Sequence, residues 1–386
     1  MPVRPPIGRL VKPRHVRYTL AKLAGGGEMS RTSTWNDWTN PLPGVPDVES
    51  PFFHDLFARK VGHPGWPEMA AHMREHGFAL IDFPDTGFDG LVDQIQADLE
   101  SRYDWDWWRA EGGAGAQGLR VQDAWSFSDA VRTIASNQIV LQLLEYLYGR
   151  PAWPFQTLNF PVGTQQHFHT DSIHFSSVPE RFMCGVWVAL EDVDESNGPL
   201  LYYPGSHKLP IFTNEHIGHL ADDPGKTRQN VFEPMWRELM RAEGLEEKRF
   251  HAKKGQALIW SANLFHGGAP HLDLDRTRWS QVTHYYFSDC LYYTPLNSDP
   301  AFGRMHIREM EDARTGRRVA NQYLGNPIPP DFMERMKRGL PEIDSLPADF
   351  DAAGYLAANP DVAGSGLDPA RHYLTYGYAE RRSYRS

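Results

Sequence analysis

The sequence predicts a mainly β fold with flanking helices, in the form of an all-β barrel or a double-sheet roll. From residue 154 to residue 289 the chain reads as short strands separated by Gly, Pro and Asn, which is the pattern of such folds. Helical periodicity precedes this region and returns in an insertion at about residues 213–247. We therefore expect one large β core with helices packed against its outside.

Three helices are predicted ahead of the strands. Apolar residues recur at helical spacing around residues 66–76, 88–99 and 126–147. Together with the strands they define the main domain, which we place at residues 52–325. A chain of 386 residues with 41% hydrophobic and 23% charged residues can bury one such core and still carry appendages.

Charge and cysteine content exclude several classes of protein. The net charge of −10 argues against nucleic acid or an anionic membrane as the main partner, because both select a basic face. Cys184 and Cys290 are the two cysteines, so no disulfide framework is available and a reducing compartment such as the cytoplasm is expected. No apolar stretch approaches the roughly 18 residues that a membrane span needs.

The amino end differs from the rest of the chain. Residues 1–31 hold seven Lys or Arg against one acidic residue, Glu28, and lack the apolar core of a secretory signal. A flexible basic arm is the simplest interpretation, and contact with a membrane surface or a polyanion is the alternative. Residues 38–51 contain four prolines and are predicted to be a linker, so that the arm and linker together span residues 1–51.

Two residues of one short motif are candidate metal ligands. His169-Thr-Asp171 lies in the alternating stretch 164–175, which we interpret as a strand, and a period of two puts both side chains on one face. A second copy, His271-Leu-Asp273, sits among Gly and Pro and is predicted to be a loop with solvated carboxylates. Two imidazoles and one carboxylate form the ligand set that holds a non-haem Fe(II) and leaves its other positions open.

The third ligand must come from a distant strand. His266 ends the apolar run 256–265, and twelve residues later Arg278-Trp-Ser280 opens another strand-like stretch. Arg278 and Ser280 share a face of that stretch, and a planar guanidinium beside a hydroxyl suits the far carboxylate of a dicarboxylic acid. His167 and His174 flank the first motif and remain alternative ligands.

The ordered set of motifs resembles the phytanoyl-CoA dioxygenase family of Fe(II)- and 2-oxoglutarate-dependent oxygenases, over roughly residues 67–290. The resemblance rests on residues 76–82, on His169-Thr-Asp171, on residues 189–200 running into 203–207, on His266 and on Arg278. Each piece is weak alone, whereas the order makes the set specific. The resemblance implies the double-stranded β-helix of cupin type, a jelly roll whose ligands converge in one mouth.

The resemblance also implies roles for single residues. In the family the His-x-Asp pair and the distal His bind iron, roles that fall on His169, Asp171 and His266. The family's arginine binds the C5 carboxylate of 2-oxoglutarate, a role that falls on Arg278.

Three further residues concern the cosubstrate. Ser280 stands beside Arg278 and is expected to share in cosubstrate binding. Trp187 matches a position that contacts 2-oxoglutarate in relatives, although it is equally interpretable as core. Arg276 also follows His266 at about the distance in sequence that is usual for the family's arginine, and it stays an alternative to Arg278.

The expected function is that of an Fe(II)- and 2-oxoglutarate-dependent dioxygenase, which uses O2 and releases succinate and CO2. We expect it to hydroxylate an unactivated C–H bond of a small-molecule or glycan- or lipid-related substrate. Asp171 favours hydroxylation, because related sites that halogenate carry a small residue in its place. Residues 101–126 and 213–250 are expected to line the substrate pocket, but their sequences contain no recognisable code.

Two other classes remain open. The first is a non-catalytic β-barrel that binds a ligand, which would take up Fe(II) without turning over 2-oxoglutarate. The second is a zinc hydrolase that uses His169, Asp171 and His266 with an activated water. Hydrolysis offers no use for Arg278-Trp-Ser280, which speaks against the second class.

A separate short module is predicted at the carboxyl end. Residues 326–348 look like a linker, and residues 349–383 look like a small helical unit that is appended to bacterial glycosyltransferases and surface-associated proteins. Its aromatic cluster would be too small to be very stable alone, so we expect it to dock on something. The implied context is bacterial, with a possible envelope- or glycan-pathway partner. The expected two-helix cluster consists of Tyr355, Leu356, Val362, His372, Tyr373 and Tyr376.

Overall fold

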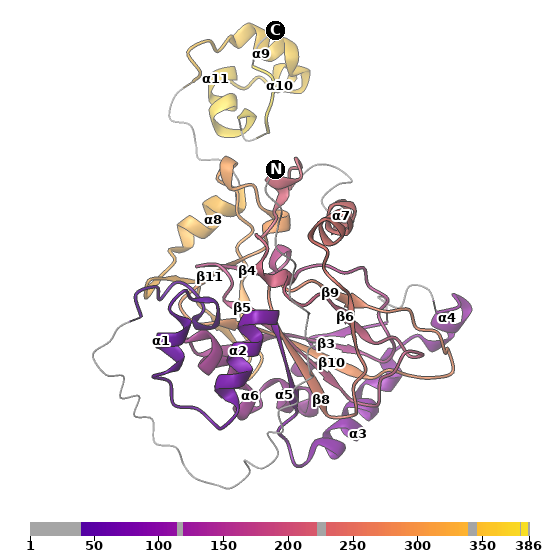
Figure 1. Cartoon of the computed structure of the whole chain (residues 1–386). Helices are drawn as coiled ribbons and strands as arrows, with labels where there is room; N and C mark the ends of the chain where they lie inside the picture. Colours follow the sequence, from indigo (N-terminus) through magenta and orange to yellow (C-terminus); the bar gives the residue numbers. More distant parts are fainter. Residues whose placement is uncertain (1–39, 114–118, 222–228, 339–345, 379, 385–386) are drawn as a thin grey trace, which may run out of the picture.

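A pair of antiparallel sheets forms the centre of the molecule in the computed structural model, which describes residues 40–113, 119–221, 229–338, 346–378 and 380–384 (Figure 1). The larger sheet has the order β1-β8-β5-β10-β3-β2. Its strands are β1 (Phe78–Asp82), β2 (Val121–Gln122), β3 (Ala152–Phe160), β5 (Met183–Ala189), β8 (Gln256–Ser261) and β10 (Ser280–Phe287).

The smaller sheet lies opposite the larger one and has the order β7-β6-β9. His169 extends it through a β-bridge to His266. From β3 to β10 the chain passes back and forth between the two sheets, which is the topology of the double-stranded β-helix and confirms the predicted jelly roll. The strands of this sheet are β6 (Leu200–Tyr202), β7 (Lys248–Phe250) and β9 (His266–Gly268).

Strand β10 is buried on both faces, because helices cover the outside of the larger sheet. Val282 points inward to the core between the sheets, whereas Tyr285 belongs to the core under the helices and donates to the carbonyl of Ala135. Helices α2, α3, α5 and α6 surround this outer face (Figure 1). The helices of the main body are α1 (Phe53–Phe57), α2 (Trp66–His76), α3 (Phe88–Leu99), α4 (Trp105–Ala110), α5 (Asp129–Ala135), α6 (Gln138–Tyr148) and α7 (Glu233–Glu243).

The predicted helix at 126–147 is two helices, α5 and α6. The Ser128 hydroxyl accepts from Val131 N–H at the start of α5, and the Asn137 side chain accepts from Ile139 and Val140 N–H at the start of α6. Side chains of this kind satisfy the free N–H groups of a first turn, so Asn137 begins a new helix inside the apolar pattern. The helices predicted at 66–76 and 88–99 are confirmed as α2 and α3, and α7 confirms a helical insertion.

The predicted strand over 164–175 is wrong. His169 makes a single bridge to the smaller sheet, and Asp171 opens a 3-10 helix, η6 (Asp171–Ile173). The carbonyl of Asp171 accepts from the N–H groups of both His174 and Phe175, which curls the backbone away from an extended course. The alternation of polar and apolar residues in this stretch therefore does not reflect a strand.

The predicted linker at 38–51 is also wrong where the structure describes it, from residue 40 onward. Asp47–Glu49 forms a 3-10 helix in which Val48 is 1% exposed. The Lys60 ammonium lies 2.7 Å from the Asp47 carboxylate, and Arg74 donates to the carbonyl of Val48. These contacts tie the proline-rich segment to the main body. The basic arm at 1–31 lies outside the described residues.

The predicted linker at 326–348 contains regular structure in its first half. Asn326–Pro327 (β15) pairs with Gln322–Tyr323 (β14), and α8 (Pro330–Arg338) follows, with the carbonyl of Met336 accepting from Met305 N–H. Prolines 327, 329 and 330 sit in the edge pairing and the first helical turn, where a missing N–H is tolerated. The remaining strands are β4 (Ser176–Val178), β11 (Leu291–Tyr293), β12 (Met310–Asp312) and β13 (Arg317–Val319).

The carboxyl-terminal module has its own small core. Tyr355, Val362 and Tyr373 are buried in it, whereas Tyr376 is 53% exposed and does not belong to it, contrary to the expectation. The module consists of four short helical segments rather than two helices, and in Figure 1 it stands beyond α8, apart from the sheets. These segments are α9 (Ala352–Ala358), α10 (Pro360–Ser365), α11 (Pro369–His372) and a π-helical turn, η12 (Tyr373–Gly377).

No helix in the described ranges is long and apolar enough to span a bilayer.

We propose that the module is a separate unit and expect a chain that ends at Arg338 to keep the stability of the main body. Arg381 meets the body at Asp299, 3.9 Å away, and over the Phe302 ring. The Arg381 side chain is 35% exposed and lies at the long end of the ion-pair range from Asp299, which is itself buried, and contacts of this kind contribute about 1 kcal/mol each. Urea unfolding followed by fluorescence should therefore give nearly the same midpoint for the two chains. An insoluble shortened chain would show that the module is part of the catalytic fold.

Candidate active site

The three predicted ligands lie together inside the barrel. His169, Asp171 and His266 are 6%, 2% and 6% exposed, and their ligand atoms lie within 4.8 Å of one another. Asp171 Oδ1 is 3.8 Å from His169 Nε2 and 3.8 Å from His266 Nε2. Within the described residues this is the one cluster of His, Cys, Asp and Glu side chains with the spacing of a metal site.

The backbone fixes the direction of both imidazoles. His169 Nδ1 lies 3.0 Å from the carbonyl of His167, and His266 Nδ1 lies 3.0 Å from the carbonyl of Leu264. A carbonyl can only accept, so each Nδ1 carries a proton, which leaves each Nε2 as the ring nitrogen that can bind a metal beside Asp171 Oδ1. Burial, with a smaller effect of His266, lowers the pKa of His169 to about 3, so this ring is neutral at physiological pH. The donor set therefore fits a divalent cation.

The second oxygen of Asp171 is held from the opposite side. Trp260 Nε1–H donates to Asp171 Oδ2 at 2.7 Å, and His284 Nε2 lies 3.6 Å from the same oxygen. Burial raises the pKa of the Asp171 carboxyl, but the neighbouring groups lower this pKa by more, so that the net shift is downward. These groups are His266, His284, His169 and the Trp260 indole. Asp171 is thus an ionised carboxylate with one oxygen left for a metal.

A glycine makes room for this indole. Gly185 faces Trp260 across the pairing of β5 with β8, and faces His284 across the pairing of β5 with β10. A Cβ at position 185 would lie 2.3 Å from the Trp260 ring, far inside van der Waals contact. The missing side chain lets Trp260 lie across the inner face of the sheet and reach Asp171.

His284 is fixed by a neighbour on β3. Its Nδ1 lies 2.9 Å from Gln156 Oε1, and both residues are buried side by side in the register of β10 with β3. Burial lowers the pKa of His284 to about 4, against the effect of Asp171, so the ring is neutral near pH 7. It lines the pocket beside the metal ligands.

Arg278 lies in the same pocket as the three ligands and is 2% exposed. Its Nη1 donates to Ser280 Oγ at 2.6 Å, its guanidinium lies 5.5 Å from the Trp187 ring centre, and its Nε has no hydrogen-bond partner among the described residues. Burial lowers the pKa of Arg278 to about 10, against the effect of Glu191, which leaves it charged at neutral pH. A buried cation with an unused donor is suited to an anionic group.

Arg276 occupies a different place. Its Nη1 lies 2.7 Å from Asp194 Oδ2 and 2.7 Å from Ser196 Oγ, and its side chain is 36% exposed. This guanidinium is already engaged in a surface ion pair outside the pocket lining. Arg278 is thus the arginine that the fold places beside the candidate metal ligands.

The alternative ligands His167 and His174 contact other groups, although His174 also lines the pocket. His167 Nδ1 lies 2.8 Å from the carbonyl of Phe168, and His174 Nε2 lies 2.9 Å from Gln229 Oε1. In the second motif, His271 Nδ1 accepts from Gly163 N–H and its Nε2 faces two carbonyls. The structure thus gives His271 a role in holding loops together.

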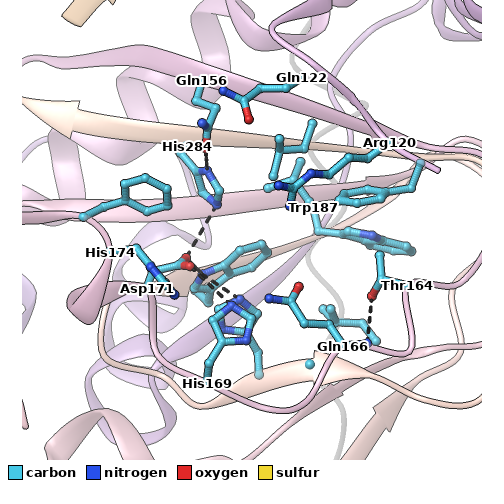
Figure 2. Close-up of a pocket in the computed structure, with 18 of the residues that line it drawn as sticks. Arg120, Gln122, Gln156, Thr164, Gln166, His169, Asp171, His174, Trp187 and His284 are labelled. Carbon is cyan, nitrogen blue, oxygen red and sulfur yellow. Dashed lines mark hydrogen bonds and ion pairs between the residues drawn. The ribbon is translucent and has the colours of Figure 1, made fainter. Parts of the chain in front are cut away.

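The pocket is a cavity of about 350 Å³ whose walls combine polar side chains with aromatic and aliphatic ones. Figure 2 shows Gln122 and Gln156 on the wall across from His169 and Asp171. The two segments expected to line the pocket do contribute to it, residues 101–126 through Arg120 and Gln122, and residues 213–250 through Gln229.

Sequence reasoning missed Trp260, His284 and Gly185. The period-two alternation that joins Arg278 to Ser280 continues to positions 282 and 284, so extending it along β10 would have found His284. Trp260 lies inside an apolar run that looks like plain core. Gly185 has meaning only when the neighbours of β5 are known, which one sequence does not reveal.

Relatives of known sequence or structure are distant. The chain is 27% identical over 164 residues to "Phytanoyl-CoA dioxygenase domain-containing protein 1" of Danio rerio, a match that covers 42% of this chain and about half, 49%, of that protein.

Three solved structures are similar. The non-heme alpha ketoglutarate dependent epimerase SnoN from nogalamycin biosynthesis has a TM-score of 0.45 at 22% identity, covering 69% of this chain and 96% of its own. The corresponding carbocyclase SnoK has a TM-score of 0.45 at 18% identity, covering 58% and 85%. EctD from S. alaskensis, solved with 2-oxoglutarate and 5-hydroxyectoine, has a TM-score of 0.41 at 15% identity, covering 79% and 88%.

A family model covers more of the chain than the sequence relative does, and the family assignment rests on this match. The model of the family "Phytanoyl-CoA dioxygenase (PhyH)" matches residues 73–277, which is more than half of the chain and contains His169, Asp171 and His266. This family is one of Fe(II)- and 2-oxoglutarate-dependent dioxygenases, as the order of motifs predicts. The chain therefore belongs to the phytanoyl-CoA dioxygenase family.

Proposed function

We propose that this protein is an Fe(II)- and 2-oxoglutarate-dependent dioxygenase that hydroxylates an unactivated C–H bond of a small molecule. One observation carries the proposal: two imidazoles and a carboxylate converge in a pocket that also contains a buried guanidinium with an unused donor. A metal and a dicarboxylate would satisfy both halves of this arrangement. Bound Fe(II) would supply the activation of O2 and the oxidative decarboxylation of 2-oxoglutarate to succinate and CO2.

The protein's residues would hold and orient these groups. His169 Nε2, His266 Nε2 and Asp171 Oδ1 would bind the metal on one side and leave its other side open to the cavity. The Arg278 guanidinium, held by Ser280 and flanked by Trp187, would bind the C5 carboxylate of 2-oxoglutarate.

Neighbouring groups would keep the first ligands in place. Trp260 would hold Asp171 to one metal-facing oxygen, since its indole occupies the other. The aromatic and aliphatic side chains around the ligands would limit the access of water.

The two alternative functions, a zinc hydrolase and a non-catalytic barrel, leave part of the site without a role. A zinc hydrolase would need the three ligands and a water, and has no use for Arg278. A non-catalytic barrel would bind Fe(II) without consuming 2-oxoglutarate. An assay of succinate formation from 2-oxoglutarate with Fe(II), first alone and then with a pool of metabolites, separates the three, because only the oxygenase forms succinate.

The setting of the enzyme is also a proposal. Both cysteines are buried free thiols, which fits a reducing cytoplasm. We propose a bacterial context in which the carboxyl-terminal module contacts a partner of an envelope or glycan pathway. Chemistry at the metal would not require that module, since its core contains none of the residues that line the pocket.

Replacing Asp171 with Ala is expected to abolish succinate formation and to weaken Fe(II) binding sharply, because the site loses its one anionic ligand. Asp273→Ala is the matched control, since Asp273 belongs to the second His-x-Asp motif outside the pocket lining. Succinate assays and Fe(II) titration measure both effects. Activity near the parent level in Asp171→Ala would exclude the assigned metal site.

Replacing Arg278 with Gln is expected to raise the KM for 2-oxoglutarate roughly thirtyfold or more, with Fe(II) affinity nearly unchanged. The reason is that breaking one buried charge-assisted pair typically costs about 2 to 5 kcal/mol. Arg276→Gln is the control, because it breaks a surface pair with Asp194. If steady-state kinetics gave the large effect for Arg276→Gln, the anchor would be Arg276 instead.

Replacing Trp260 with Phe is expected to weaken Fe(II) binding by about 10- to 100-fold, the usual effect of losing a hydrogen bond to a metal ligand. Trp66→Phe is the control, because Trp66 is also buried but its Nε1 has no partner among the described residues. Equal Fe(II) affinities of the two variants, measured by titration, would show that the Trp260 bond does not support the metal.

A further inference from the structure

We infer that the substrate carries an anionic group, a carboxylate or a phosphate, and that Arg120 binds it on the wall across the pocket from the metal ligands. The inference rests on the proposed function and narrows it to a class of substrate. Three observations carry it: the charges of the described residues that line the cavity, the lack of a partner for Arg120 among the described residues, and the position of Arg120 in the sheet.

The charges in the pocket do not balance without such a group. Among the described residues that line the cavity, Asp171 is the one acidic side chain, and Arg120 and Arg278 are the two guanidinium groups. With a divalent metal, 2-oxoglutarate as a dianion, ionised Asp171, charged Arg278 and neutral imidazoles, the formal charges sum to zero. The charge of Arg120 is left over. A substrate with one negative charge would neutralise it.

No side chain of the described residues provides that charge. Arg120 makes no hydrogen bond or ion pair with them, whereas Arg276 pairs with Asp194 and Arg249 pairs with Glu195. Arg278, the other guanidinium of the lining, donates to Ser280, so Arg120 is the lining guanidinium that has no partner among the described residues.

The register of the larger sheet directs Arg120 into the cavity. Gln122 on β2 lies opposite Leu158 on β3, so position 120 lies opposite Phe160, and all four side chains line the cavity. Figure 2 shows Arg120 on the wall across from His169 and Asp171. Arg120 is also exposed to solvent, so an incoming anion can reach it, and Phe160 of the cavity lining would lie beside the bound anion.

Amide groups in the same walls indicate that the substrate is polar beyond its charge. Gln156 and Gln229 use their Oε1 atoms on His284 and His174, which leaves their amide N–H groups for another acceptor. The Gln166 side chain has no hydrogen-bond partner among the described residues and also lines the cavity. Donors of this kind select against a purely apolar chain, because they would be left unpaired beside it.

Paramagnetic NMR on the full chain tests the inference without relying on turnover. Mn(II) in the metal site, with saturating 2-oxoglutarate to occupy Arg278, broadens the proton signals of small molecules that bind nearby. The probes are benzoate against benzamide and phenyl phosphate against phenol, two pairs that differ mainly in charge. We expect at least one anion to bind about tenfold or more tightly than its neutral counterpart. The tighter anion identifies a carboxylate or a phosphate as the recognised group.

Substitutions of Arg120 test whether this residue causes the preference for the anionic probe. Arg120→Gln should remove the preference for the anion and leave benzamide and phenol unchanged, and Arg120→Lys should keep part of it. Arg109→Gln is the matched control, because Arg109 is an exposed arginine of α4 that pairs with Asp106 and does not line the cavity. Equal binding of anion and neutral probe, no binding of any probe, or an unchanged preference in Arg120→Gln would each overturn the inference.

Failure of the proposed function is distinguishable from these outcomes. The EPR signal of free Mn(II) reports directly whether the metal binds, and its persistence in the presence of protein would contradict the metal site alone. Saturation-transfer NMR on metal-free Arg278→Gln protein then reads anion binding without the metal or the cosubstrate anchor. If the double variant Arg278→Gln/Arg120→Gln loses the saturation-transfer signal of the anion, the inference is supported. If the double variant keeps this signal, the inference is overturned.

Discussion

The pairing of two backbone segments that lie far apart in the sequence is the constraint on which the site depends. The N–H of His169 donates to the carbonyl of His266 at 2.9 Å, and the N–H of His266 donates back to the carbonyl of His169 at 3.0 Å. This exchange sets the two imidazoles beside each other at the edge of the smaller sheet, before any metal is present. Asp171 follows His169 in a tight 3-10 turn, which brings its carboxylate under both rings. Metal affinity thus depends on strand pairing as well as on ligand identity.

The larger sheet links this site to the helical layer. One face of β10 presents Val282 and His284 to the barrel interior, and the other presents Thr283 and Tyr285 toward the helices. Packed elements of this kind transmit displacement, because interiors are dense and have few voids. A helix that shifted against Tyr285 would shift His284 on the same strand, and with it the surroundings of Asp171.

The sequence predicts site residues well where the chemistry requires particular residue types. It predicts local backbone structure less well where that structure depends on neighbours in space. The proximity of His169, Asp171, His266 and Arg278 could be predicted, because few side chains can hold a metal or a carboxylate and because order and alternation limit the choice. The course of residues 164–175 could not, since a bridge and a 3-10 turn leave no distinctive pattern of their own. The segment from residue 40 resembled a linker by its prolines, although the ion pair of Asp47 with Lys60 fixes it to the body. Pairs of this kind are invisible without the fold.

Gly185 sets a limit on how far the core of this protein could be strengthened. A glycine in the middle of a central strand is less favourable than alanine by roughly 0.5–1 kcal/mol, because it loses more backbone freedom on folding and packs less surface. Here that empty position is occupied by the edge of the Trp260 indole. An alanine at position 185 would have to displace the buried indole that orients Asp171, and overpacking of this kind typically costs about 1 to 3 kcal/mol. The usual gain from replacing a strand glycine is therefore closed to this protein at the position where the glycine makes room for the site.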